Sequence, residues 1–330
     1  MKRHSLPIFV PHVGCSHRCS FCDQRAISGA ADAPTPDRVA ALCAAALRDM
    51  GKAVTNSEIA FFGGSFTAID PGYRAALLKA TVPFVGPGRF RGIRLSTRPD
   101  AVTSEILSDL GHYGVTAVEL GAQSMDDAVL ARNGRGHTAA DTAKAARLIQ
   151  GAGFELALQM MTGLPGDTPE GGRETARHII ALRPDAVRIY PTVVLEGTEL
   201  EAAFRAGDYR PQSLDEAVAD CAALLMLFEE AGIPVIKLGL HAGLAGYVAG
   251  PYHPAFRQLC EGRIMRERLE WQLPPGFKGD IVVAVHPADV SNMVGQGRRN
   301  TDTLRERGVR LHIQTDADGR RLWPVVMDAK

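Results

Sequence analysis

The stretch FELALQMMTGLPGDTPEGGRETARHIIALRPDAVRIY, residues 154–190, holds one full unit of the pattern that decides the fold. Apolar residues dominate 154–161, and a turn containing Gly and Pro follows. Apolar residues then recur at helical spacing over 170–182, and a second apolar run starts at residue 186. A strand, a helix and a strand in this order predict two parallel strands joined by a helical crossover.

The same alternation continues toward both ends of the chain. It predicts the strands 6–10, 58–62, 92–96, 115–120, 154–161, 186–190 and 234–240, and the helices 38–50, 73–80, 103–113, 138–151, 170–182 and 214–231. Six or seven such units predict an α/β fold with a parallel sheet curled into a partial (β/α)6-type barrel. A closed barrel of eight units would need a further pair.

Unusual loops follow six of the expected strands. In order they are GCSHRC (14–19), GGSF (63–66), STRPD (96–100), GAQS (121–124), TGLPGDT (162–168) and PTVVLEGTE (191–199). The carboxyl ends of parallel strands meet at one rim, where ligands bind in folds of this kind. The sequence therefore predicts one functional site at that rim.

Composition limits the class of protein. The chain has 330 residues, of which 45% are apolar and 22% charged, with 37 Lys and Arg against 37 Asp and Glu. The balance excludes a whole-chain basic footprint for nucleic acid, although not a local one. No apolar run reaches the length of a membrane span, and residues 1–7 lack the apolar core of a signal peptide. We expect a cytoplasmic protein with reduced thiols.

Three of the six cysteines form a tight cluster, Cys15, Cys19 and Cys22. Soft thiolate ligands at this spacing indicate an iron–sulfur cluster or zinc. Three cysteines would leave one iron of a four-iron cluster open, whereas zinc would recruit a fourth ligand such as His12 or His17. A disulfide is disfavoured in a reducing compartment. The other cysteines are isolated and expected in the core: Cys43, Cys221 and Cys260.

The segment CSHRCSFC, residues 15–22, resembles the CxxxCxxC signature of radical S-adenosylmethionine (SAM) enzymes, including the aromatic residue before the third cysteine. More narrowly, the chain resembles the radical-SAM domain of the elongator catalytic-subunit family and the oxygen-independent coproporphyrinogen oxidase family. The resemblance covers about residues 5–240. The segments that carry it are FGGSFT (62–67), ELGAQS (119–124), NGRGHT (133–138) and TGLPGDT (162–168).

The resemblance implies a cofactor set. Cys15, Cys19 and Cys22 would ligate a [4Fe–4S] cluster, and its open iron would bind SAM. Reductive cleavage of SAM would yield a 5′-deoxyadenosyl radical that abstracts a hydrogen atom from the substrate. An external electron donor is then an expected partner. No catalytic side chain is assigned from the sequence.

The resemblance also implies SAM contacts. Gly63, Gly64 and Ser65 match a loop whose backbone meets the methionyl ammonium, but Ser65 stands where many members have Glu. Gln123 matches a ribose contact, and Gln159 stands where that pattern has Asp, while Arg135 matches an Arg that pairs with the SAM carboxylate. Taken singly, each of these residues also fits an ordinary turn, strand end or surface loop.

The pattern changes after residue 240. We expect a barrel over 1–240 and a C-terminal extension over 241–330, which begins with a loop or crossing segment rich in Gly, Tyr and Pro over 241–260. Elongator catalytic subunits carry an acetyltransferase domain, for which the extension leaves no room. The chain is therefore not expected to run that two-part reaction alone.

Residues 280–314 of the extension are predicted to form strand, helix, helix and strand. They resemble the core of a KH RNA-binding module, whose Gly-x-x-Gly loop clamps a nucleic-acid backbone. The loop contains Gly295 and Gly297, with Arg298 at the last glycine of the motif and Arg299 after it. These residues are the predicted RNA contacts, and a small capping subdomain is the alternative.

Three functions follow from the sequence. The first is a radical SAM enzyme that modifies tRNA or rRNA, which depends on the elongator-like resemblance and the KH-like segment. The second is a radical SAM enzyme acting on a small molecule or a tetrapyrrole-like substrate. The third is a non-enzymatic RNA-binding protein stapled by zinc.

Overall fold

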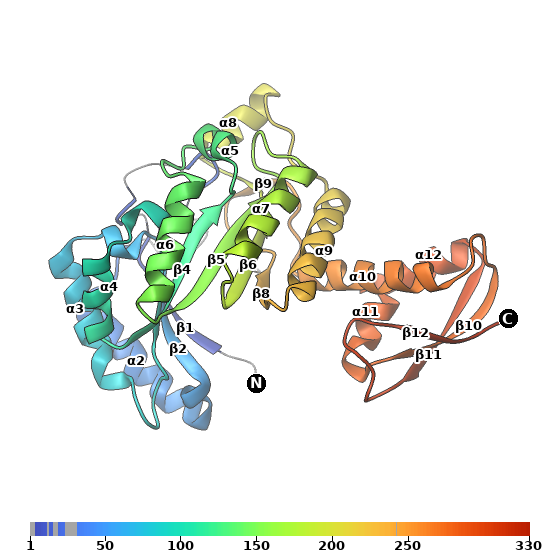
Figure 1. The fold of residues 1–330 in the computed structure, drawn as a ribbon, viewed down its shortest axis with the longest axis horizontal. Coiled ribbons are helices and arrows are strands. Elements are labelled where there is room, and N and C mark those ends of the chain that lie inside the picture. The colour runs from blue at the N-terminus through green and yellow to red at the C-terminus, as the bar shows by residue number, and fades with distance from the viewer. Residues whose placement is uncertain (1–3, 12, 16–18, 24–31, 242) are drawn as a thin grey trace.

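The computed structural model describes residues 4–11, 13–15, 19–23, 32–241 and 243–330. Within these residues, its main element is a seven-stranded parallel sheet in the order β1-β2-β3-β4-β5-β6-β8 (Figure 1). The order follows the chain, as expected for repeated strand–helix units, and the sheet curls into a half-barrel. Its strands are β1 (His4–Phe9), β2 (Ser57–Phe62), β3 (Ile93–Thr97), β4 (Val115–Gln123), β5 (Glu155–Thr162), β6 (Ala186–Pro191) and β8 (Val235–Leu238).

Helices cover the outer face of this sheet. They are α2 (Pro36–Met50), α3 (Pro71–Thr81), α4 (Ser104–His112), α6 (Ala139–Gly151), α7 (Pro169–Ala181) and α9 (Leu214–Glu230). Two further helices, α5 (Asp127–Arg132) and α8 (Glu199–Ala206), lie together beyond the carboxyl ends of the strands (Figure 1). Short 3-10 turns complete the connections at Gly51–Asn56, Phe66–Ala68, Val82–Phe84 and Pro99–Ala101.

Local sequence explains where these helices begin. A Ser, Thr or Asp side chain accepts a hydrogen bond from the first turn at the start of each of them, including Thr138 before α6 and Ser213 before α9. Both of these also complete a capping box, with Asp141 and Glu216. Such caps satisfy backbone N–H groups that a helix leaves free, so the loop-to-helix junctions at the rim are fixed locally.

The strands alternate between two faces, with register irregularities at Ile93/Arg94, Gly121/Gln123 and Val187/Arg188. Leu120, Leu158 and Ile189 are fully buried against the helices in the main core. Their neighbours in sequence point to the inner face of the half-barrel, and many are polar. Two rows of register-matched residues cross this face: Ser96, Glu119, Ala157 and Ala186, and then Gly121, Gln159, Arg188 and Lys237. The inner face is thus the polar one.

The connection after β8 differs from its expected form. A small sheet pairs β7 (Val194–Leu195) with β9 (Tyr247–Ala249), and the 17-residue helix α10 (Phe256–Gln272) begins inside the segment that the sequence predicts as a loop. The prolines and glycines over 241–254 are typical of a loop, and α10 has no side-chain cap at its N-terminus. Residues that favour a helix follow only after Pro254, so the sequence before α10 contains no signal for a helix start.

The C-terminal part forms a second lobe, joined to the half-barrel through α10 (Figure 1). Its elements are β10 (Gly279–Val285), a 3-10 turn (Pro287–Asp289), α11 (Val290–Val294), a second 3-10 turn (Gln296–Arg298), α12 (Arg299–Glu306), β11 (Val309–Thr315) and β12 (Val325–Ala329). β10 is central, parallel to β11 and antiparallel to β12. The expected strand–helix–helix–strand order is present.

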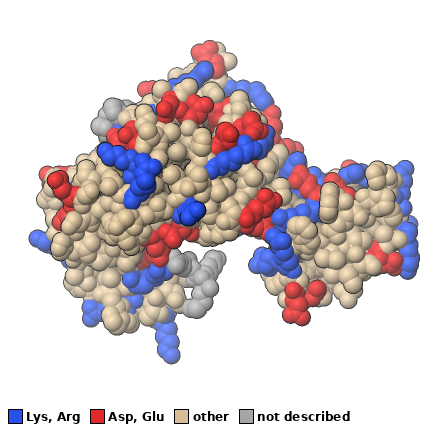
Figure 2. Space-filling view, in the orientation of Figure 1, with Lys and Arg blue, Asp and Glu red and all other residues tan. Residues whose placement is uncertain are grey.

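Helix α10 contributes to two separate hydrophobic clusters. Phe256 and Ile264, in its first part, pack in the main core, whereas Met265 and Leu269 pack with the strands of the C-terminal lobe. The helix therefore spans the two parts, and the domain boundary expected at residue 240 stays a prediction. Figure 2 shows Lys and Arg interleaved with Asp and Glu on both parts of the visible face.

Candidate active site at the carboxyl ends of the strands

The cysteine loop follows β1 directly. Cys15, Cys19 and Cys22 are each half-buried, and the backbone N–H of Cys22 donates to the carbonyl of Cys19 at 3.1 Å. His12 and His17, the fourth ligands considered for zinc, lie outside the described residues. The thiols lie close together: Cys19 raises the pKa of Cys15, and Cys19 and Cys15 both raise that of Cys22.

Asn133 anchors this loop, a role that no motif in the sequence indicates. It is fully buried, and its Oδ1 accepts from the Ser20 hydroxyl at 3.0 Å, while its Nδ2 donates to the carbonyl of Pro165 at 3.0 Å. The backbone N–H of Ser20 also donates to the Asn133 carbonyl. One side chain therefore connects the cysteine loop to the loop after β5. Its only signal in the sequence is an Asn–Gly turn inside the family-like segment.

The two glycines after β2 allow the cysteine loop to lie against the sheet. Gly63 has φ +103°, a conformation that favours glycine. A Cβ on Gly64 would lie 2.3 Å from the carbonyl oxygen of Val13, and a Cβ on Gly14 would lie 2.3 Å from that of Ser65. Packing between these two backbones is thus a reason for glycine in addition to the expected SAM contact, which stays a prediction.

Ser65 uses its side chain within the protein. The residue is 1% exposed; its Oγ lies 2.9 Å from the Thr97 Oγ1 and accepts from the backbone N–H of Arg98 at 3.2 Å. The hydroxyl of Thr67 joins the same group at 2.5 Å from Thr97. These bonds connect the rim loops after β2 and β3. The Ser65 backbone N–H donates to the carbonyl of Val13 at 3.2 Å, and it also lies near the Cys15 thiol, whose pKa it lowers.

Arg135 bridges the cysteine loop and the sheet. It is 7% exposed; its Nη1 donates to the Cys19 Sγ at 3.1 Å and its Nη2 to the carbonyl of Gly121 at 2.6 Å. Its Nε is buried and has no hydrogen-bond partner among the described residues. The guanidinium predicted to bind the SAM carboxylate therefore lies at the cysteine loop with one donor free.

Gln123 and Gln159 are brought together at the ends of β4 and β5. The Gln159 Nε2 donates to the Gln123 Oε1 at 3.1 Å. Gln123 has φ +65°, which is costly for a residue with a Cβ, and such strain concentrates at functional sites. A Cβ on Gly121 would lie 2.9 Å from the Gln123 Nε2, so this amide and Arg135 crowd the same small space.

The electrostatics of the thiols follow from burial and two arginines. Burial raises the pKa of Cys15, and burial with the two neighbouring thiols raises the pKa of Cys22 to about 12. Arg98 and Arg135 lower the pKa of Cys15, and Arg135 lowers that of Cys22. Metal ligation takes the thiolate, so the nearby guanidinium groups favour the form that a cluster requires.

The donor set fits an iron–sulfur cluster. Across the part of the chain that the structure describes, no three or more His, Cys, Asp and Glu side chains converge on one metal position. A four-iron cluster takes each thiolate on a different iron and so needs no such convergence. Three thiols on one loop, with backbone and guanidinium donors at the sulfurs, fit a [4Fe–4S] cluster with one open iron.

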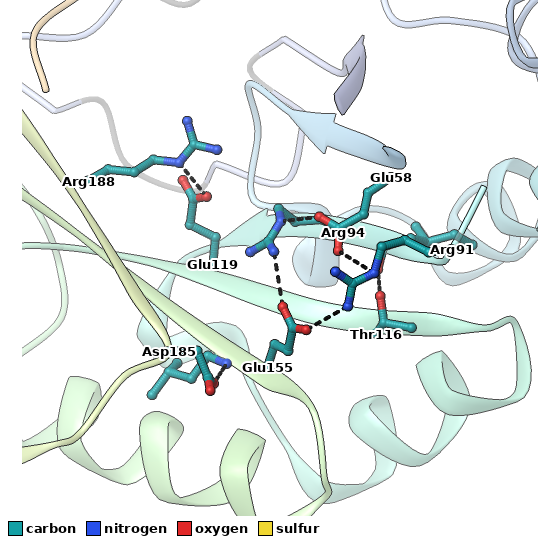
Figure 3. Close-up of polar contacts among 10 residues, drawn as sticks. Glu58, Arg91, Arg94, Thr116, Glu119, Glu155, Asp185 and Arg188 are labelled. Carbon is teal, nitrogen blue, oxygen red and sulfur yellow. Dashed lines mark hydrogen bonds and ion pairs between the residues drawn. The ribbon is translucent and has the colours of Figure 1, made fainter. Parts of the chain in front are cut away.

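Below the rim, the inner face of the sheet carries paired charges (Figure 3). Arg188 Nε donates to Glu119 Oε2 at 2.7 Å, and the Glu119 side chain is only 3% exposed. The Arg188 guanidinium also lies over the ring of Phe62, 5.2 Å from its centroid. Near the amino ends of the strands, Arg94 pairs with Glu58 at 2.9 Å and with Glu155 at 3.4 Å. The strands thus present matched charges to the interior of the half-barrel.

The loop predicted to bind RNA lies between α11 and α12, away from the rim. Gly295 has φ +81° and Gly297 φ +59°, and Arg298 shares this left-handed conformation with φ +66°. Arg298 is exposed, without an ion pair among the described residues. Arg299 instead pairs with Asp215 of α9 at 2.5 Å. Both side chains of that pair are exposed, and such pairs are weak, so Arg298 and Arg299 both stay predicted RNA contacts.

The family follows from a comparison with known protein families. The model of the radical SAM superfamily matches residues 9–179, which contain the three cysteines and the first five rim loops. The chain belongs to the radical SAM superfamily. A second model, the radical SAM C-terminal domain, matches residues 184–266. Enzymes of this superfamily use a [4Fe–4S] cluster and SAM, so the zinc-stapled, non-enzymatic alternative is set aside.

Curated relatives include enzymes named for tRNA. The tRNA uridine(34) acetyltransferase of Dehalococcoides mccartyi is 30% identical over 202 residues, 54% of this chain and 44% of that protein. The same-named protein of Methanocaldococcus jannaschii is 29% identical over 192 residues, 52% of this chain and 36% of that protein. Elongator complex protein 3 of Homo sapiens is 30% identical over 202 residues, 54% and 37%. This radical SAM enzyme thus spans less than half the length of these relatives.

Solved structures share the fold. The archaeal Methanocaldococcus infernus Elp3 with an N-terminal deletion superposes with a TM-score of 0.63 at 21% identity, over 81% of this chain and 63% of that one. Coproporphyrinogen III oxidase from Escherichia coli gives a TM-score of 0.50 at 17% identity, over 70% and 53%. The expected partial barrel is confirmed.

No helix among the described residues is long and apolar enough to cross a membrane.

Proposed function

We propose that this radical SAM enzyme modifies an RNA, with tRNA as the first substrate class to test and rRNA as the second. The observation that carries the proposal is the similarity to proteins named for tRNA uridine 34, at 29% and 30% identity. The acetyl transfer in their name is not carried over, because the aligned part is less than half of each relative.

Different residues at the rim would bind the cluster and SAM. Cys15, Cys19 and Cys22 would hold the cluster, and Arg135 would orient its Cys19 ligand while offering its free Nε to the SAM carboxylate. The Gln123–Gln159 pair would offer an oxygen and amide donors to the ribose. When bound, the cluster and SAM supply a 5′-deoxyadenosyl radical that abstracts a hydrogen atom from the substrate.

The C-terminal lobe supports the RNA part of the proposal. The loop before α12 contains three residues with positive φ: Gly295, Gly297 and Arg298. Together with the N-terminus of α12, it presents backbone N–H groups and the unpaired guanidinium of Arg298. Backbone donors and arginine are what phosphate contacts use. Arg299 forms an exposed ion pair with Asp215, which a phosphate would replace at little cost, so it stays in the predicted contact set.

The test is transfer of substrate hydrogen. Anaerobically reconstituted protein, SAM and dithionite are incubated with deuterated bulk tRNA, with deuterated rRNA, or without RNA. The proposal predicts that tRNA or rRNA increases 5′-deoxyadenosine above the RNA-free level and that the product carries deuterium, with a mass change in one nucleoside. Active protein whose 5′-deoxyadenosine never gains deuterium from either RNA would contradict the RNA proposal and favour a small-molecule substrate.

A further inference from the structure

Lys237 lies on the inner face of the half-barrel, at the edge of the main sheet. It lies on β8, the last strand of the main sheet, in register with Arg188 of β6. Register-matched residues of parallel strands point to the same side, so Lys237 continues the row of Gly121, Gln159 and Arg188. The row therefore runs from the carbonyl that Arg135 contacts to the open edge of the half-barrel.

The charges around Lys237 are paired, but its own is not. Arg188 bonds Glu119 at 2.7 Å, and Arg257 bonds Glu261 at 2.7 Å and the carbonyl of Val235 at 2.7 Å. Lys237 is half-buried, and its ammonium forms no ion pair or hydrogen bond among the described residues. The Lys237 ammonium thus lacks a counter-charge among the described residues, while two guanidinium groups lie near enough to affect its charge.

This arrangement costs free energy in the absence of a ligand. Burial lowers the pKa of Lys237, and the charges of Arg188 and Arg257 lower it further. A half-buried ammonium next to like charges is unfavourable unless an anion joins it. A perturbed, unpartnered group on the inner face of the half-barrel is a candidate for a binding site.

We propose that the Lys237 ammonium binds a phosphate of the RNA substrate at the open edge of the half-barrel. The inference rests on the proposed function, since RNA supplies one phosphate anion per nucleotide. A lysine serves as a compact point charge for such a group. The phosphate would place the adjoining nucleotide along the row that leads to Gln159 and the cysteine loop. Lys237 is then a substrate-positioning residue.

The experiment measures RNA affinity against salt for the reconstituted full chain. Bulk tRNA is the probe, and the slope of log affinity against log salt counts the phosphate contacts. Loss of one contact reduces that slope by about 0.7 to 0.9. We expect Lys237→Gln to lower the slope by this amount and Lys237→Arg to retain it. Lys79→Gln, an exposed lysine of α3 on the outer layer, should match the wild type.

A second readout separates ligand binding from a structural role. If Lys237 stabilised the fold, Lys237→Gln would lower the free energy of unfolding. The inference predicts that the RNA-free variant is as stable as the wild type or more so, because an unpaired charge is removed. A destabilised variant that keeps the wild-type slope would overturn the inference.

The outcomes also separate this inference from the proposed function. A wild-type protein that binds neither tRNA nor rRNA would overturn both. Salt-dependent binding by the wild type with an unchanged slope in Lys237→Gln would overturn the role of Lys237 alone and leave the RNA proposal standing.

Discussion

The Nη1 of Arg135 lies 3.1 Å from the Sγ of Cys19, so one guanidinium from the loop after α5 donates to the central cysteine of the cluster motif. The same group donates to the carbonyl of Gly121 at the end of β4. A cysteine ligand, a charged donor and the sheet are thereby fixed relative to one another. Hydrogen bonds to ligand atoms tune metal sites and position their ligands.

Replacing Arg135 should therefore impair the site without unfolding the protein. For Arg135→Met we expect the rate of 5′-deoxyadenosine formation to fall about 10- to 100-fold, the usual effect of losing a partner of a metal ligand. The rate and the iron content are measured together. Arg147→Met, an exposed arginine on α6, is the control and should leave both unchanged. An unaltered rate in Arg135→Met would refute the role given to this residue.

Loss of Asn133 should loosen two rim loops together. Asn133→Ala leaves the Ser20 hydroxyl and the Pro165 carbonyl without their buried partner. We expect the free energy of unfolding to fall by about 1–3 kcal/mol, the cost of an unsatisfied buried polar group. Urea unfolding measures it, and Asn56→Ala at a half-buried surface turn is the comparison. Equal effects at the two positions would show that Asn133 is not an anchor.

Removing one partner of the buried pair Glu119–Arg188 should lower the free energy of unfolding strongly. Replacing both partners with apolar residues should lower it little. Glu119→Gln leaves the buried guanidinium without its carboxylate, and we expect a loss of about 3 kcal/mol or more. The double variant Glu119→Leu with Arg188→Met should recover most of it. The exposed pair of Glu170 and Arg173 should contribute far less to stability, because solvent screens it. A double variant no more stable than Glu119→Gln would argue against this account.

Arg298 should affect stability and RNA binding in opposite directions. Its φ of +66° costs an L-residue about 1–2 kcal/mol, so Arg298→Gly should stabilise the protein. The same change removes the one unpaired arginine of the loop and should lower the salt slope of RNA binding by about 0.7 to 0.9. Thermal unfolding and binding titrations report the two effects. A stabilised variant with an unchanged slope would remove Arg298 from the RNA contacts.

Asp167, in the loop after β5, should titrate within the working range of pH. Burial raises the pKa of its carboxyl from 3.8 to about 6, with Asp126 and Asp220 adding to the shift. A carboxyl whose folded pKa is raised binds protons more readily in the folded state, so its contribution to stability falls as pH rises from about 4 to 6. Asp167→Asn should gain stability relative to the wild type across that window and keep a constant gain above it. A pH-independent difference would contradict the shift.

Local patterns made most of the fold predictable. The expected strand 58–62 is β2 (Ser57–Phe62), and the expected helix 138–151 is α6 (Ala139–Gly151) with Thr138 as its cap. Alternating or helical spacing of apolar residues and side-chain caps are local signals, so short windows carry them. The start of α10 was missed because the residues before it have the composition of a loop.

Long-range contacts were not predictable from such windows. The cysteine motif and Arg135 were identified through a resemblance, but the bond between Arg135 and Cys19 joins residues 116 positions apart. The clash that a Cβ on Gly64 would cause with Val13 depends on how β1 and β2 pair. Asn133 and Glu119 gain their partners only when the sheet is assembled. Strand register and burial determine these contacts, and neither can be inferred from a short stretch of sequence.

The central claim is that Cys15, Cys19 and Cys22 hold a cluster that cleaves SAM. Anaerobic reconstitution followed by iron and sulfide counts, with a dithionite and SAM assay for 5′-deoxyadenosine, tests it beside a Cys19→Ala variant. The account predicts about four irons and four sulfides per chain, with nucleoside release that the variant loses. A protein that holds one zinc ion and releases no 5′-deoxyadenosine would contradict it.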